Sequence, residues 1–162
     1  MDQSKVYTEA EAERLFAIRF HGKTWDLLDK PDRTPADDAL MVDYVHASLA
    51  HWRAAGTPLN EQRGLWFLSR VYSVLGQAQT ALYYADRCQE LTLAHPELMQ
   101  DFDIAFAFEA LARAHALAGN LVEAEKYLLL ARQAGDAIQE EEDRKVFKDS
   151  LDGGEWHGLI SS

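Results

Sequence analysis

Apolar side chains recur every three or four positions along most of the chain, which is the spacing of one face of an α-helix. The first such stretch covers residues 8–29 and begins with Thr8 and Glu11. These two side chains have the spacing of a capping box, in which each satisfies a free backbone amide at the start of a helix. Thr34 and Pro35 open the second stretch with a residue favoured at the N-cap and one favoured at the first helical position. The sequence therefore predicts two helices before Gly56.

The same period continues to the end of the chain, interrupted by short turn signals. Gly76 and Gly119 each follow a periodic stretch and can adopt the left-handed conformation that ends a helix. Further helices are predicted over residues 60–75, 78–94, 99–118, 121–138 and 140–152. Short connections favour antiparallel neighbours. We therefore predict an all-α fold of about seven helices in antiparallel hairpins, followed by a tail at 153–162.

Composition and charge limit the classes of partner. Alanine and leucine far outnumber valine, isoleucine and threonine, which favours helices over sheet. The formal net charge of −11 speaks against nucleic acid and against an anionic membrane surface, because phosphate binding depends on clustered Lys and Arg. Cys88 is the single cysteine, the first residues are polar, and no apolar stretch has the length of a membrane span. A cytoplasmic protein is expected.

Two parts of the chain are similar to each other at an offset of 43 residues. The offset aligns identical residues at five places: Leu68 with Leu111, Arg70 with Arg113, Gly76 with Gly119, Ala81 with Ala124, and Tyr84 with Tyr127. It also aligns Tyr72 with His115, and Cys88 with Ala131. Small residues at such positions allow two antiparallel helices to approach closely. The similarity predicts two copies of one helical hairpin.

The order of leucine, small residue, aromatic residue, glycine and alanine in residues 60–138 resembles the tetratricopeptide repeat. The offset of 43 is longer than the usual period of about 34 residues. The resemblance implies a short right-handed solenoid of stacked hairpins that forms one domain, residues 1–162. Its expected parts are a degenerate first helix pair at 8–56, repeats at 60–95 and 99–138, and a capping helix at 140–152 that carries Val146, Phe147 and Leu151.

In such a solenoid the first helix of each hairpin lines a concave surface. The resemblance places eight residues there: Arg63, Trp66, Arg70, Ser73, Phe106, Glu109, Arg113 and Ala116. Guanidinium groups suit carboxylates and phosphates, and a tryptophan is a typical interface anchor. We expect a module that binds a protein or peptide segment in this groove, with Arg63, Trp66, Arg70, Phe106, Glu109 and Arg113 as its contact residues. The partner is not identified by the sequence.

Each of these residues also has a purely structural interpretation. Arg70 is four residues after Trp66 and can stack on its indole, and Glu109 and Arg113 have the spacing of an intrahelical ion pair. Asp103 is a second candidate partner for Arg70. A structural network and a binding face therefore both remain open.

Other functions remain open beside peptide binding. One is a small-molecule sensor or enzyme with a pocket between the first helix pair and the repeats, to which Arg19, Trp25 and His51 would contribute. Another is an assembly module whose groove is filled by its own tail. Trp156 is unusual for a free tail, and we expect it to dock either on its own domain or on a second copy, which would make a homodimer.

Signals for catalysis and metal binding are absent from the sequence. No H-E-x-x-H, cysteine pair, glycine-rich phosphate loop or G-x-S-x-G occurs. Cys88 aligns with an alanine on the buried side of its helix, where cysteine is usually an inert hydrophobe. We therefore expect no catalytic residue, no metal and no cofactor.

Overall fold

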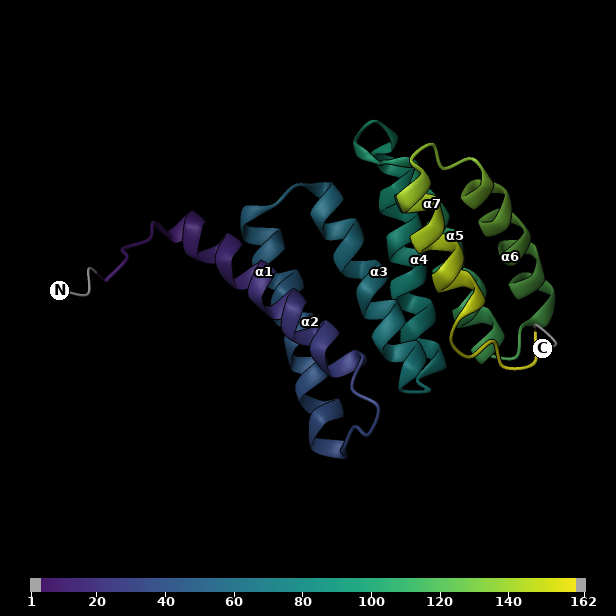
Figure 1. Cartoon of the computed structure of the whole chain (residues 1–162), viewed down its shortest axis with the longest axis horizontal. Helices are drawn as coiled ribbons and strands as arrows, with labels where there is room; N and C mark the ends of the chain where they lie inside the picture. The colour runs from purple at the N-terminus through teal and green to yellow at the C-terminus, as the bar shows by residue number, and fades with distance from the viewer. Residues whose placement is uncertain (1–3, 160–162) are drawn as a thin grey trace. The chain divides into compact units, whose positions relative to one another are not determined.

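The computed structural model describes residues 4–159, and these form seven α-helices, one 3-10 turn and no β-strand (Figure 1). The all-α prediction is confirmed. The elements are α1 (Glu9–Leu28), α2 (Pro35–Ala55), α3 (Pro58–Val74), α4 (Ala78–Ala94), η1 (Pro96–Leu98), α5 (Asp101–Leu117), α6 (Leu121–Asp136) and α7 (Glu141–Asp152). Packing divides the described residues into two compact units, with the division after Gly64 inside α3. The single domain stays a prediction.

Both predicted threonine caps are present. The Thr8 hydroxyl accepts a hydrogen bond from the Glu11 amide at 3.3 Å, and the Thr8 amide donates to the Glu11 carboxylate at 2.8 Å. Thr34 and Asp37 form the same reciprocal pair at the start of α2. These bonds satisfy amides that a helix start leaves free, so they fix where α1 and α2 begin.

The first unit is built on the contact between α1 and α2. Met41, Val45 and Leu49 of α2 are buried. Ala17 of α1 is fully buried, and its carbonyl accepts a hydrogen bond of 2.8 Å from the buried Ser48 hydroxyl. The small side chain of Ala17 allows this close approach, and the hydrogen bond satisfies the polar group that the contact buries.

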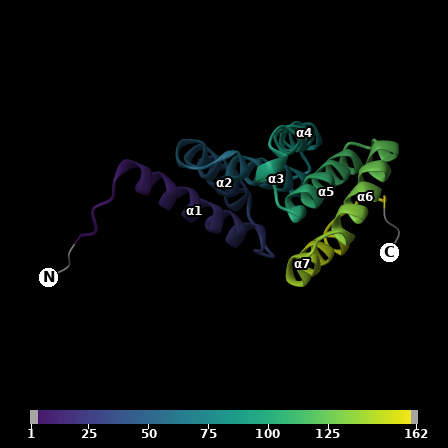
Figure 2. The same cartoon turned by 90° about the horizontal axis from the view of Figure 1, so that it is seen from above.

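The second unit is arranged around α5. This helix packs against α4, α6 and α7 (Figure 2), and ten of its 17 residues are buried. Most of the buried positions are alanine, which lets several helices approach one axis. Three of them, Asp103, Glu109 and Arg113, are charged, and the last two form an ion pair. The second unit therefore places an ionisable pair on its central helix.

Two turns in this unit have matching geometry. Gly76 and Gly119 end α3 and α5 with φ angles of +72° and +79°, the left-handed region that favours glycine. The rings of Tyr72 and Tyr84 stack with centroids 5.7 Å apart, and those of His115 and Tyr127 stack at 5.5 Å. Each residue of the second stack lies 43 positions after its equivalent in the first.

Helix α7 covers the edge of the second unit. Phe147 is fully buried and Leu151 is 7% exposed, whereas Val146 is 60% exposed. Val146 therefore lies outside the buried face of α7, which Phe147 and Leu151 form at a spacing of four residues. No helix in the described part of the chain is long and apolar enough to cross a membrane.

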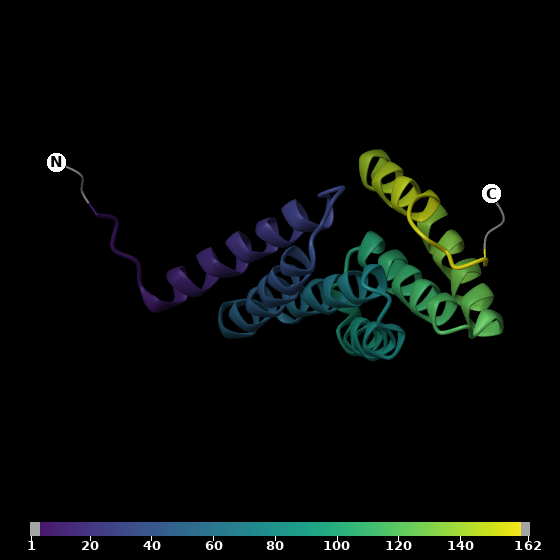
Figure 3. The same cartoon turned by 90° about the horizontal axis from the view of Figure 1, so that it is seen from below.

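The tail turns back after α7 and crosses the second unit (Figure 3). Trp156 is 6% exposed, packs in the same apolar cluster as Phe147, and donates a hydrogen bond of 2.9 Å from its indole to the carbonyl of Leu151. Of the two arrangements expected for Trp156, the structure contains the one in which it docks on its own chain.

Candidate functional site

The candidate site is a charged cluster centred on Glu109. The carboxylate of Glu109 pairs with Arg113 on the same helix and accepts a hydrogen bond of 3.3 Å from the indole of Trp66. Arg70 lies 4.0 Å from the same carboxylate. Glu109 and Arg113 are 1% and 2% exposed. A buried charge is tolerated only when it is paired and hydrogen-bonded, and this cluster meets that requirement for both residues.

Two helices bring these residues together. Trp66 and Arg70 are one turn apart on α3, while Phe106, Glu109 and Arg113 follow one another at spacings of three and four on α5. Residues at these spacings share one helix face. The faces meet where the ring of Phe106 packs edge-on against Trp66, with centroids 5.2 Å apart. The helical spacing within each segment and the packing of α3 against α5 together assemble the cluster.

Arg113 also holds the end of the chain. Its terminal nitrogens donate to the backbone carbonyls of Ser150 at 2.5 Å, Gly153 at 2.8 Å and Glu155 at 3.2 Å. The guanidinium lies over the indole of Trp156, with its central carbon 4.0 Å from the ring centroid. A guanidinium has five N–H donors, and these bonds together with the Glu109 pair use four of them. The tail therefore occupies the place where a ligand of Arg113 was expected.

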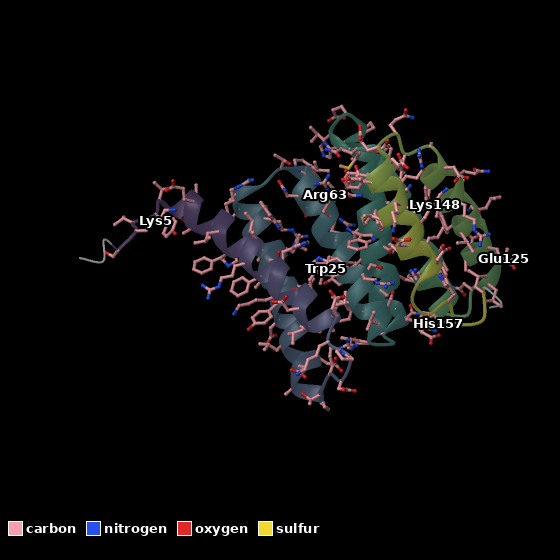
Figure 4. All side chains as sticks on the ribbon, viewed as in Figure 1. Lys5, Trp25, Arg63, Glu125, Lys148 and His157 are labelled. Carbon is pink, nitrogen blue, oxygen red and sulfur yellow. The ribbon has the colours of Figure 1, made fainter. Side chains whose placement is uncertain are left out.

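Arg70 borders a cavity of about 270 Å³ beside the tail. We call it the Arg70 cavity, and it is lined by Arg70, Ser73, Val74, Gly76, Arg113, Gly154, Glu155 and His157. Figure 4 labels His157 at this end of the second unit. Burial lowers the pKa of the Arg70 guanidinium, Glu109 opposes that shift, and the charge of Arg113 adds to it.

The second unit contains five of the six predicted contact residues, namely Trp66, Arg70, Phe106, Glu109 and Arg113. Arg63 belongs to the first unit and is half-buried there. The Glu109–Arg113 ion pair of the structural interpretation is present. Asp103 does not pair with Arg70, because its carboxylate caps the amide of Gln100 at 3.0 Å and Arg70 faces Glu109 instead.

The three residues proposed for a small-molecule pocket all lie in the first unit, where two of them contact other side chains. Nδ1 of His51 lies 2.5 Å from a carboxylate oxygen of Glu13. The indole of Trp25, labelled in Figure 4, donates to Nε2 of His21 at 3.1 Å. Arg19 is exposed. The pocket stays a prediction.

Two further features of the described residues bear on reactive and metal-binding groups. Cys88 is fully buried, and burial raises the pKa of its thiol. The reactive form of a cysteine is the thiolate, so this side chain behaves as a small apolar residue. Within residues 4–159 no group of three or more His, Cys, Asp or Glu side chains is placed to hold a metal ion.

Three contributors to the cluster were missed at the sequence level, namely the backbone carbonyls of Ser150, Gly153 and Glu155. Backbone acceptors carry no residue identity, so no motif marks them. The available signal was the diglycine that precedes Trp156, since Gly154 has a φ angle of +73°. That conformation lets the chain turn back toward Arg113.

Comparison of this chain with protein-family models, with curated proteins and with solved structures found no match. The resemblance to the tetratricopeptide repeat therefore rests on the residues of this chain alone.

Proposed function

We propose that this protein is a non-catalytic binding module of the tetratricopeptide-like kind, which holds a protein segment on the face that α3 and α5 form in the second unit. The observation that carries the proposal is the grip of Arg113 on three backbone carbonyls together with its stacking on Trp156. Backbone carbonyls are common to every protein segment, and an indole is an effective anchor. The tail is then an internal ligand that a partner segment would replace or extend.

Two further observations support a repeat architecture. The left-handed turns at Gly76 and Gly119 lie 43 residues apart, and so do the ring stacks that begin with Tyr72 and His115. Repeats of this kind present extended binding surfaces because each hairpin contacts mainly its neighbours.

A homodimer fits the same proposal through exchange of the tail. Trp156 docks on its own chain, and an identical site on a second copy would accept it equally well. We also propose the cytoplasm as the location, since the buried thiol of Cys88 forms no disulfide.

The proposal is tested by selecting peptides from a displayed library on the wild-type protein and on Trp156→Ala, which frees the face. We expect peptides that bind Trp156→Ala more tightly than the wild type and that compete with a synthetic peptide of residues 152–159. Arg70→Ala should weaken them, whereas Arg87→Ala removes an exposed charge on α4 and should not. Arg113 is unsuitable for this test because its removal leaves Glu109 buried without its cation. Failure to select any competing peptide would refute the proposal.

A further inference from the structure

We propose that the Arg70 cavity binds the carboxylate of a small organic acid, with Arg70 as its principal partner and the docked tail as its lid. This inference goes beyond the proposed peptide binding: both use Arg70, but the acid would bind while the tail is in place, whereas a peptide would replace the tail.

Arg70 is a partly buried cation whose guanidinium makes no hydrogen bond to a described residue. Its side chain is 21% exposed, and its nearest carboxylate, that of Glu109, lies at 4.0 Å, beyond hydrogen-bond distance. No residue among 4–159 accepts a hydrogen bond from its guanidinium. The guanidinium faces the cavity, so its donors are available to a ligand there. An anion would accept charge-assisted hydrogen bonds from them, which are stronger than bonds to a neutral acceptor.

The charges around the cavity favour a monoanion. Arg70 and Arg113 share one buried carboxylate, that of Glu109, so one positive charge is left over. Glu155 adds a carboxylate to the wall, but it is exposed and therefore solvated. A single surplus charge matches a carboxylate better than a doubly charged phosphate, and a planar guanidinium can bind a carboxylate through two parallel hydrogen bonds.

The geometry of Gly154 shows that both guanidinium groups reach the same part of the wall. A Cβ atom added at this residue would lie 3.0 Å from Nη1 of Arg113 and 3.3 Å from Nη2 of Arg70. Arg113 keeps one N–H that no described residue uses, and the Ser73 hydroxyl, also on the wall, makes no hydrogen bond to the described part of the chain. Arg70, Arg113 and Ser73 therefore all line the same cavity with hydrogen-bond donors.

The size and the walls of the cavity define the ligand further. A volume of about 270 Å³ is below that of pockets for drug-sized molecules, so the ligand is an acid of a few carbon atoms. Gly154, Glu155 and His157 come from the tail. Because the cavity is complete only when the tail is docked, binding of the acid stabilises the docked tail by mass action.

The test is a calorimetric titration of the full-length protein with acetate, propionate and succinate at constant ionic strength, with inorganic phosphate as the comparison. We expect saturable binding of one carboxylate per chain, at least tenfold weaker in Arg70→Met and unchanged in Arg87→Ala. Glu155→Gln removes an exposed opposing charge and should tighten binding several-fold. Amide exchange in residues 153–159 should slow when the acid is bound.

Three results would overturn the inference. The first is the absence of saturable binding by any of the three acids to the wild-type protein and to Glu155→Gln. The second is equal affinity in folded Arg70→Met and the wild type. The third is a preference for phosphate over all three carboxylates. Glu155→Gln changes only an exposed side chain and should fold. Its calorimetric titration therefore tests whether the cavity binds a carboxylate even if Arg70→Met does not fold.

Discussion

Arg113 lies over Trp156 while it is also paired with Glu109, so one side chain joins the central helix of the second unit to the end of the chain. The distance from its central carbon to the indole centroid is 4.0 Å. This arrangement explains why an arginine can be 2% exposed in this unit. Its charge is balanced by a carboxylate, its donors are used by carbonyls, and its flat face is covered by an aromatic ring.

Loss of Arg113 should destabilise the second unit strongly. In Arg113→Met the carboxylate of Glu109 remains buried without its cation, which typically lowers the free energy of unfolding by about 3–5 kcal/mol. Adding Glu109→Gln removes the unpaired charge, and we expect the double variant to recover about 1–3 kcal/mol. Chemical denaturation of the two single variants and the double variant measures this coupling. Purely additive effects would show that the pair is not energetically linked.

Removal of the Trp156 ring should release the tail. Trp156→Ala removes a buried aromatic side chain, and we expect a loss of at most about 3–5 kcal/mol because undocking of the tail limits the loss. Amide exchange in residues 153–159 should become fast, while α4 keeps its protection. Tyr83→Ala is the control, since Tyr83 is 58% exposed and its loss should change stability by about 0.5 kcal/mol or less. Continued protection of the tail in Trp156→Ala would contradict this account.

The helices were predictable because their ends depend on local signals. Helix α4 begins at Ala78 and ends at Ala94, as predicted, and Thr8 and Thr34 cap α1 and α2 through residues three positions away. Such contacts involve neighbours in the sequence and can be read without knowledge of the tertiary structure. The exposure of Val146 was not predictable in this way, since it depends on which face of α7 packs against α5 and α6.

The candidate site shows the same division between local and distant contacts. The Glu109–Arg113 pair follows from a spacing of four residues on one helix. The other partners of Arg113 are carbonyls 37, 40 and 42 positions away. Any residue type supplies a carbonyl, so the sequence contains no record of this contact. The sequence therefore indicated that Arg113 could bind an anion, but it did not indicate that Arg113 donates hydrogen bonds to the carbonyls of Ser150, Gly153 and Glu155.

The contact between α6 and α7 can be tested with a matched pair of glycines. A methyl group at Gly135 would overlap the ring of Phe147, which is fully buried and packs on Phe106 at 5.0 Å between centroids. Gly135→Ala should therefore lower stability by about 1–3 kcal/mol through overpacking. At Gly22 in α1 an added Cβ meets nothing within 4 Å, so Gly22→Ala should raise stability by about 0.5–1 kcal/mol. Thermal unfolding of both variants measures whether stability falls in Gly135→Ala and rises in Gly22→Ala. If both substitutions raised stability, Phe147 would not pack against Gly135.

The first unit should lose stability in mild acid because of His21. Burial lowers the pKa of this imidazole below its usual 6.5, and its Nε2 accepts a hydrogen bond from Trp25, which requires the neutral ring. The unfolded chain therefore takes up a proton at a higher pH than the folded chain does. Stability is full above about pH 6.5 and falls as the pH decreases from there toward the folded-state pKa.

Glutamine is the informative replacement for His21, since its carbonyl can accept the hydrogen bond from Trp25 but does not titrate. We expect His21→Gln to lose less stability than the wild type between pH 7.5 and pH 5.5 in chemical denaturation. Burial also lowers the pKa of His46, so part of the pH dependence should remain in His21→Gln and disappear when His46→Gln is added. An NMR titration of the His21 ring measures its pKa directly, and a value at or above 6.5 would refute this explanation. Because protonation of His21 breaks its bond to Trp25, the chemical shift of the Trp25 indole proton should follow the same titration.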